Sequence, residues 1–142
     1  MKAIGKFAEL ERDGQHPSLK AVQGHIPTSE RAAVVAYLKA GLGVLDVTES
    51  TADPLNPKNH ISGGPSLLTD GKWVWRFDLS HYVEHYGVEL PAHFLADVRA
   101  WRGTPFTLTG KQLEAAMSEF GWAQPLLPAD GPASASLRQS RS

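Results

Sequence analysis

The fold of this chain is decided by one stretch, Ser66-Leu-Leu-Thr-Asp-Gly-Lys-Trp-Val-Trp-Arg-Phe-Asp-Leu-Ser-His-Tyr-Val-Glu-His-Tyr86. Two short runs rich in apolar residues flank Asp70-Gly71, and Asp-Gly tolerates the positive φ angles of a two-residue type I′ turn. After the second run, the alternating pattern of a strand gives way to the spacing of an amphipathic helix. We therefore predict a β-hairpin over about 66–76 with a helix directly behind it.

The two-residue turn fixes the expected pairing of the hairpin. Thr69 should face Lys72, and Leu68 should face Trp73. Because successive side chains of a strand point to opposite faces, Leu68, Trp73 and Trp75 should share one face of the hairpin. We expect the two indoles to cover the helices of the core, which is a commoner use than a ligand platform.

The helix after the hairpin has clear signals at both ends. Asp78 can cap its first turn through the side-chain carboxylate, and Gly87 suits its end. A second helix should begin near Leu90, with Pro91 in its first position. The predicted apolar stripe of the first helix is Leu79, Tyr82, Val83 and Tyr86, and that of the second is Phe94, Leu95, Val98 and Trp101.

The same residues carry a family resemblance. The pattern is Thr69-Asp70-Gly71-x-Trp73-x-Trp75-x-x-Asp78-Leu79-x-x-Tyr82-x-x-x-Tyr86, followed by Leu90-Pro91-x-x-Phe94. It resembles a group of small bacterial proteins that includes immunity partners of polymorphic and contact-dependent toxins. The matching part runs from about 64 to 98, roughly a quarter of the chain. The resemblance implies a binding role and carries over no catalytic residue.

Length and composition are those of one globular domain. At 142 residues, with 42% hydrophobic and 20% charged residues, the chain can bury a sizeable core. We expect a single α+β domain over 1–128, with a small antiparallel sheet packed against several amphipathic helices. The segment 129–142 is rich in Pro, Ala and Ser without periodicity, and we expect it to be a disordered tail.

Three observations on the sequence bear on its cellular location. The chain has no cysteine, which excludes disulfides and thiol catalysis. Acidic residues interrupt the first twelve positions, where a signal peptide needs an unbroken apolar run, and no later segment is long and apolar enough for a membrane span. We expect a cytoplasmic protein with no membrane partner.

Charge is distributed unevenly, although the net charge is only −1. Residues 46–97 contain eight acidic residues against three basic ones, and both flanking segments are positive. An acidic centre disfavours nucleic acid and favours a basic partner, such as a nuclease-like toxin, unless the acids simply form a solvated face. The candidate partner-binding residues are Asp53, Asp70, Glu84, Glu89, His81 and His85.

The rest of the chain shows weaker signals. We expect a short helix over 2–11, a strand over 43–48 and an ordered, proline-containing loop with little regular structure over 49–64. A helix should start at Thr28 or Ser29. Another should start at Thr109, because Gln112 three residues later completes a capping box.

The pair His81-x-x-x-His85 is the clearest chemical motif. The i, i+4 spacing places two imidazoles on one helical face, as at the start of many zinc sites. The match is partial, because Tyr82 stands where a metalloprotease needs glutamate and no third ligand follows from the spacing. We therefore predict no cofactor and no metal ligand, and favour an exposed helix face or a partner contact.

These observations favour a non-enzymatic protein, most simply an immunity protein that occludes the active or substrate-binding surface of a cognate toxin. The rival is a small hydrolase-like or metal-binding enzyme with a pocket of His60, Asp70, His81 and His85, which could hold zinc. The third alternative is an interaction module whose acidic face serves some other protein.

Overall fold

The computed structural model describes residues 1–12 and 14–121. In this part a four-stranded sheet, in the order β1-β6-β5-β2, lies between layers of helices, and a separate two-stranded sheet pairs β3 with β4. The strands are β1 (Lys2–Ala3), β2 (Leu42–Leu45), β3 (Ser50–Asp53), β4 (Asn56–Ser62), β5 (Leu67–Thr69) and β6 (Trp73–Arg76). The helices are α1 (Ala8–Glu11), α2 (Thr28–Lys39), α3 (Leu79–Tyr86), α4 (Ala92–Ala100) and α5 (Gly110–Glu119). The α+β prediction is confirmed, while the tail predicted over 129–142 lies outside the described residues.

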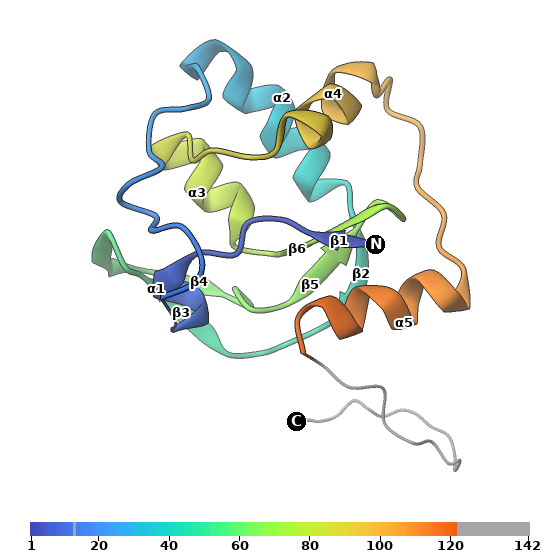
Figure 1. The fold of residues 1–142 in the computed structure, drawn as a ribbon, viewed down its shortest axis with the longest axis horizontal. Coiled ribbons are helices and arrows are strands. Elements are labelled where there is room, and N and C mark those ends of the chain that lie inside the picture. The colour runs from blue at the N-terminus through green and yellow to red at the C-terminus, as the bar shows by residue number, and fades with distance from the viewer. Residues whose placement is uncertain (13, 122–142) are drawn as a thin grey trace.

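The layers follow from the two faces of the sheet. In Figure 1, α2, α3 and α4 lie on one side of the four-stranded sheet, and α5 lies on the other. Trp73 and Trp75 are buried in the larger core with the three helices. Leu67 and Val74 form the smaller core with Ala116 of α5. The predicted division of hairpin residues between the two faces is therefore confirmed.

The register of the β5–β6 hairpin differs from the prediction. Thr69 pairs with Val74, and Leu68 pairs with Trp75, a shift of two residues. The physical reason is the Asp70 carboxylate, whose Oδ1 accepts the backbone N–H groups of Lys72 at 2.9 Å and Trp73 at 2.7 Å and so holds a longer turn. A shift of two residues leaves every side chain on its predicted face.

The helix signals are confirmed in position and partly corrected in chemistry. Gly87 ends α3 in the left-handed conformation at φ 58°, as its lack of a Cβ allows. Asp78 stands at the N-terminal cap position of α3, but its side chain makes no capping hydrogen bond. Thr109 and Gln112 form the predicted capping box of α5. Pro91 lies one residue before α4, at its cap.

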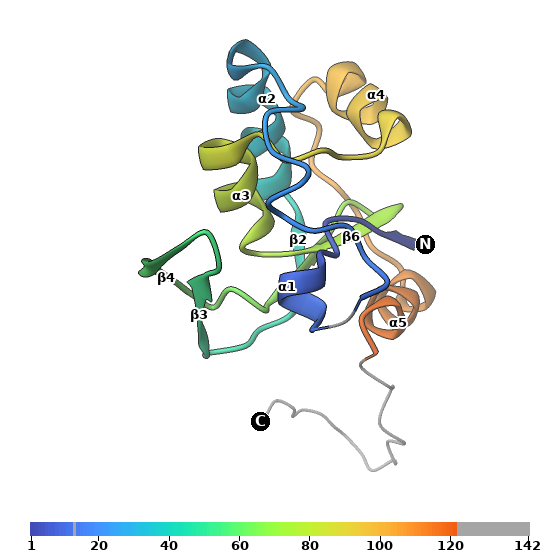
Figure 2. The ribbon, with the colours of Figure 1, turned by 60° about the vertical axis from the view of Figure 1, so that its left-hand side comes forward.

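Two predicted segments are wrong. The helix expected over 2–11 is a strand, β1, parallel to β6, followed by the four-residue α1. The loop predicted over 49–64 contains the β3–β4 hairpin, in which Asp53 and Asn56, each followed by proline, are strand residues, whereas Gly64 before Pro65 lies in a turn. Figures 1 and 2 both show this hairpin at the end of the molecule beside α3, away from α5. Within the described residues, no helix is long and apolar enough to cross a membrane.

Candidate functional site

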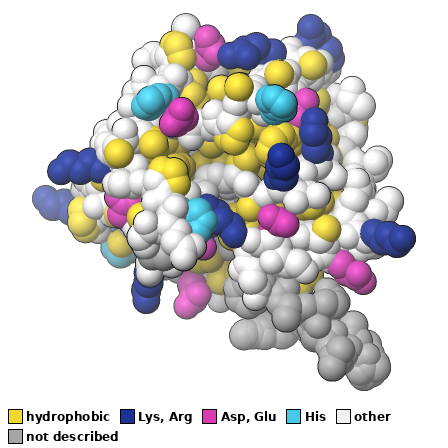
Figure 3. Space-filling view, in the orientation of Figure 1, with side chains coloured by type: hydrophobic (Ala, Val, Ile, Leu, Met, Phe, Trp, Pro, Cys, Tyr) yellow, Lys and Arg dark blue, Asp and Glu magenta, His cyan; other side chains and the backbone are white. Residues whose placement is uncertain are grey.

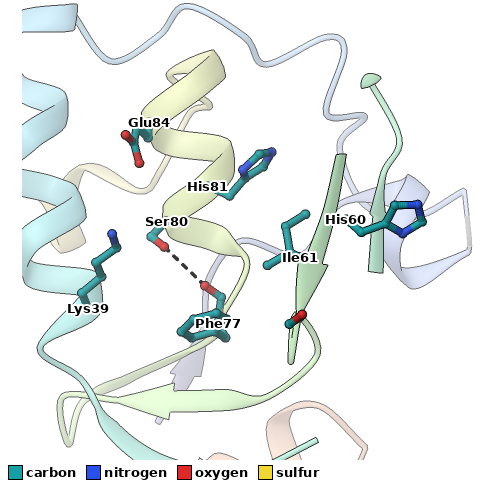
Figure 4. A pocket seen from close by; sticks show the side chains of 8 residues that line it. Lys39, His60, Ile61, Phe77, Ser80, His81 and Glu84 are labelled. Atoms are coloured by element: carbon teal, nitrogen blue, oxygen red, sulfur yellow. Dashed lines mark hydrogen bonds between the residues drawn. The ribbon is translucent and has the colours of Figure 1, made fainter. Parts of the chain in front are cut away.

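An open hollow of about 480 Å³ lies between α3 and the β3–β4 hairpin. Figure 4 shows Ser80 and Glu84 of α3 and Lys39 of α2 on one side, with Ile61 of β4 on the other. The remaining lining residues are His60, Ser62, Phe77 and His81. Phe77 lines this hollow too. Among the described residues it is the large hydrophobic side chain that is exposed, with 39% of its surface accessible. A hollow with these properties is accessible from solvent and offers one aromatic contact.

A buried carboxylate supports one wall of this hollow. Asp53, at the end of β3, is fully buried, and its Oδ2 accepts hydrogen bonds from His81 Nε2 at 2.8 Å and Tyr86 Oη at 2.6 Å. Its Oδ1 accepts the backbone N–H of Leu55 at 2.8 Å. These bonds tie the β3–β4 hairpin to α3 and fix the orientation of the His81 ring.

The electrostatics of this cluster keep Asp53 ionised. Burial raises the pKa of Asp53, but the hydrogen bonds from Tyr86 and His81 outweigh it and hold the pKa below its ordinary value. Burial and the hydrogen bond to Asp53 raise the pKa of Tyr86 to about 12. Since an ionised carboxylate can only accept hydrogen bonds, the proton between Asp53 and His81 lies on His81 Nε2.

A second buried charge pair lies under the start of α3. Arg76 Nε and Nη2 donate to Asp78 Oδ1 and Oδ2 at 3.1 and 2.8 Å, and this bidentate pair replaces the expected capping role of Asp78. Burial raises the pKa of Asp78 to about 6, with Arg76 opposing that rise. A Cβ at position 64 would collide with the Thr51 hydroxyl and crowd Asp78, so the close approach of the backbone at this point requires glycine.

The structure separates the six predicted partner-binding residues. His81 and Glu84 line the hollow, and the His85 ring lies next to that of His81, with ring centroids 4.4 Å apart. Asp53 has no exposed surface, so the expectation that it contacts a partner directly is corrected: it supports His81 from behind. The remaining two, Asp70 and Glu89, lie elsewhere.

Asp70 belongs to the β5–β6 turn. Its carboxylate accepts the Tyr37 hydroxyl and holds the turn N–H groups, and it does not line the hollow. The enzyme pocket predicted from His60, Asp70, His81 and His85 is therefore not assembled as expected. In Figure 4, His60 lies on β4 with its ring turned away from α3.

Glu89 lines a second hollow, of about 500 Å³, between the N-terminal segment and the start of α4. Its apolar floor includes Ile4, Phe7 and Leu90. On the face of the molecule seen in Figure 1, Figure 3 shows hydrophobic side chains toward the middle with charged and histidine side chains around them.

The acidic centre of the sequence does not become one acidic patch. Asp53 and Asp78 are buried in polar contacts, and Asp97 accepts Trp73 Nε1 at 2.8 Å and pairs with Lys72 at 3.0 Å. The acids of this segment that remain exposed are Asp46, Glu49, Glu84 and Glu89. The surface charge available to a partner is smaller than the sequence count indicates.

The chemistry available to the site is limited. His81, oriented by a buried carboxylate, is suited to accept a proton at its free Nδ1. The nearby Ser80 hydroxyl donates to the Phe77 carbonyl at 3.4 Å, and none of the described histidines is its hydrogen-bond partner. Among the described residues, no group of three or more His, Cys, Asp or Glu side chains is placed to hold a metal ion.

Sequence reasoning missed Phe77, Tyr86 and Lys39 as site residues. The sequence gives no signal for Phe77 as a site residue, because a large apolar residue just before a helix cap usually packs on the helix, whereas this ring is 39% exposed. Tyr86 was assigned to the apolar stripe, and nothing in its spacing indicates a hydrogen bond to Asp53. Lys39 joins the hollow only through the packing of α2 on α3.

Comparisons of this chain with protein-family models, with curated proteins and with solved structures found no match.

Proposed function

We propose that this chain is a binding protein whose partner is another protein, and specifically an immunity protein that occludes the active or substrate-binding surface of a bacterial toxin in the cytoplasm. The observation that carries the proposal is the exposed Phe77 ring in the open hollow beside α3. Exposed aromatic side chains in a recess are enriched at the centres of protein interfaces, where their burial contributes much of the affinity.

The charges around Phe77 support a protein partner. Lys39 and Glu84 are both exposed, and neither has an ion-pair partner within the described residues. Complementary charges on a partner can pair with them without breaking an internal contact. The exposed acidic side chains of Asp46, Glu49 and Glu89 favour a partner of basic character. The resemblance of residues 64–98 to toxin-immunity proteins suggests which class of partner this is.

The rigidity of the wall also supports binding. Asp53 of β3 accepts hydrogen bonds from His81 and Tyr86 of α3 through one carboxylate oxygen, so the hairpin is tied to the helix and this wall of the hollow is ordered before a partner arrives. An interface that is ordered in advance loses less conformational entropy on association.

The Asp53–His81 pair favours a second candidate function, a hydrolase-like enzyme with His81 as general base. A carboxylate behind an imidazole is the arrangement that orients a catalytic histidine. The exchange His81→Gln would abolish such an activity, whereas a binding role for the Phe77 surface predicts that the same exchange leaves most of the affinity.

The proposal is tested by capturing partners from the native cell lysate with the full chain and with two charge-matched variants. Glu84→Lys changes the hollow, and Glu114→Lys makes the same change on exposed α5, on the other side of the sheet. We expect a basic toxin domain held one to one, weakened by salt, lost with Glu84→Lys and retained with Glu114→Lys. Equal capture by both variants, or no toxin at all, would overturn the proposal.

A further inference from the structure

Two histidines on one turn of α3 have neighbouring imidazole rings. The ring centroids of His81 and His85 are 4.4 Å apart, and the ring planes are inclined by 43°. His85 is exposed, and the His81 side chain is 17% exposed, so a small ion can approach both from solvent. The pairing results from the i, i+4 spacing, which places the two rings on the same helical face.

The nitrogen atoms of these rings are available for a ligand. His81 Nε2 donates to Asp53, and in a neutral imidazole the other nitrogen, Nδ1, then carries a lone pair. Within residues 1–12 and 14–121, His85 makes ring contacts with His81 and Tyr86 but no hydrogen bond or ion pair. Each ring thus offers a nitrogen acceptor without breaking an internal bond.

Asp53 has the position of the supporting carboxylate at a histidine metal site. Metal-binding histidines almost always donate their second ring N–H to a carboxylate, carbonyl or water, which fixes the tautomer and raises the basicity of the coordinating nitrogen. Asp53 is fully buried and held by Tyr86 as well, so it keeps this orientation. An exposed histidine pair without such support would have neither ring fixed.

The surrounding charges favour a cation on balance. The Asp53 carboxylate lies behind His81, 2.8 Å from its Nε2, and Glu84 is exposed on the same helix. Lys39 lines the hollow from α2 and opposes a cation, whereas the charge of Arg76 is paired with Asp78. Two carboxylates therefore stand against one unpaired ammonium group.

We propose that His81 and His85 chelate one divalent transition-metal ion of the class that prefers imidazole, such as Zn²⁺, Ni²⁺ or Cu²⁺. Protein side chains supply two ligands, since no third His, Cys, Asp or Glu is placed with them among the described residues, and solvent completes the coordination. This inference goes beyond the proposed function and needs no partner protein. Hard cations such as Mg²⁺, which prefer oxygen ligands, should not bind here.

The test is calorimetric titration of the full chain, free of any histidine tag, with ZnCl₂ and separately with MgCl₂. The decisive variant is His85→Gln, because this exposed side chain can be exchanged without loss of core packing. The matched controls are His25→Gln and His93→Gln, which remove exposed histidines that lie outside the pair and do not line the hollow beside α3. All variants are checked for native folding by circular dichroism.

We expect Zn²⁺ to bind one to one, Mg²⁺ to give no binding heat, and His85→Gln to lower the apparent Zn²⁺ affinity by about tenfold or more, with both controls unchanged. Asp53→Asn should lower the affinity by about tenfold although both imidazoles remain. No Zn²⁺ binding by the wild-type chain, wild-type affinity in His85→Gln, or an equal loss in the controls would overturn the proposal. Capture of a toxin tests the proposed function separately, and neither result decides the other.

Discussion

Replacing Arg76 by methionine should destabilise the protein strongly at neutral pH and much less at acidic pH. The Arg76 side chain is 11% exposed, and that of its partner Asp78 is fully buried. Removing one member of a buried pair leaves an uncompensated charge. Because Asp78 can take up a proton instead, the cost grows by at most about 1.4 kcal/mol per pH unit above pH 6 and reaches about 3 kcal/mol of unfolding free energy at pH 8. Methionine keeps most of the aliphatic volume, so the charge dominates this loss.

The pH dependence follows from the pKa of Asp78. Burial already raises this pKa to about 6 with Arg76 present, and removing Arg76 raises it further. A carboxyl whose pKa is higher in the folded than in the unfolded state makes stability fall as pH rises from about 4 to the folded pKa. In Arg76→Met this fall continues above pH 6, at up to about 1.4 kcal/mol per pH unit.

The difference between variant and wild type should therefore be largest near pH 8 and small near pH 5. Urea unfolding followed by tryptophan fluorescence measures it, since the indoles of Trp73 and Trp75 are buried. The matched control is Arg99→Met, which removes an exposed pair with Glu30 and should change stability little at either pH. An equal cost at both pH values, or a cost below about 1 kcal/mol at pH 8, would refute the reasoning.

Three further predictions concern stability. Gly87→Ala should lower the unfolding free energy measured in urea by about 1 kcal/mol or more, because φ is 58° and an added Cβ would press on the Arg31 guanidinium. An unchanged urea midpoint would contradict this prediction. Thr109→Ala should cost about 1 kcal/mol in the same assay, and Thr109→Ser, which can rebuild the capping box, should recover most of it. The Asp53 pKa is lowered on folding, so the contribution of this carboxylate to stability is present above about pH 4 and is lost below it. Asp53→Asn should therefore make the unfolding free energy depend less on pH in the acid range. An unchanged pH dependence would contradict the hydrogen bonds assigned to Asp53.

The hairpin, its two faces and four of the helices could be predicted because their signals are local. Asp70-Gly71, the two alternating indoles, Gly87 and the Thr109–Gln112 box each act within a few residues. The hairpin register could not be predicted in the same way. It depends on competition between a two-residue turn and the Asp70 carboxylate, which captures two backbone N–H groups and lengthens the turn.

The β3–β4 hairpin was missed because its strands carry no core-facing pattern. Most of β4 is exposed, so hydrophobic alternation, the main signal of a strand, is absent. The side chain that matters is Asp53, whose partner His81 lies 28 residues later, and sequence spacing contains no trace of that bond. The His81–His85 pair could be singled out from its helical spacing, whereas the role of Asp53 needed the fold.

The most direct test of a partner-binding surface beside α3 is amide hydrogen exchange of the chain, measured free and in complex with the captured toxin domain. Protection should increase over residues 77–85, which carry Phe77 and Glu84, and remain unchanged over α5 on the other side of the sheet. Protection that increases over α5 with residues 77–85 unchanged would contradict the account.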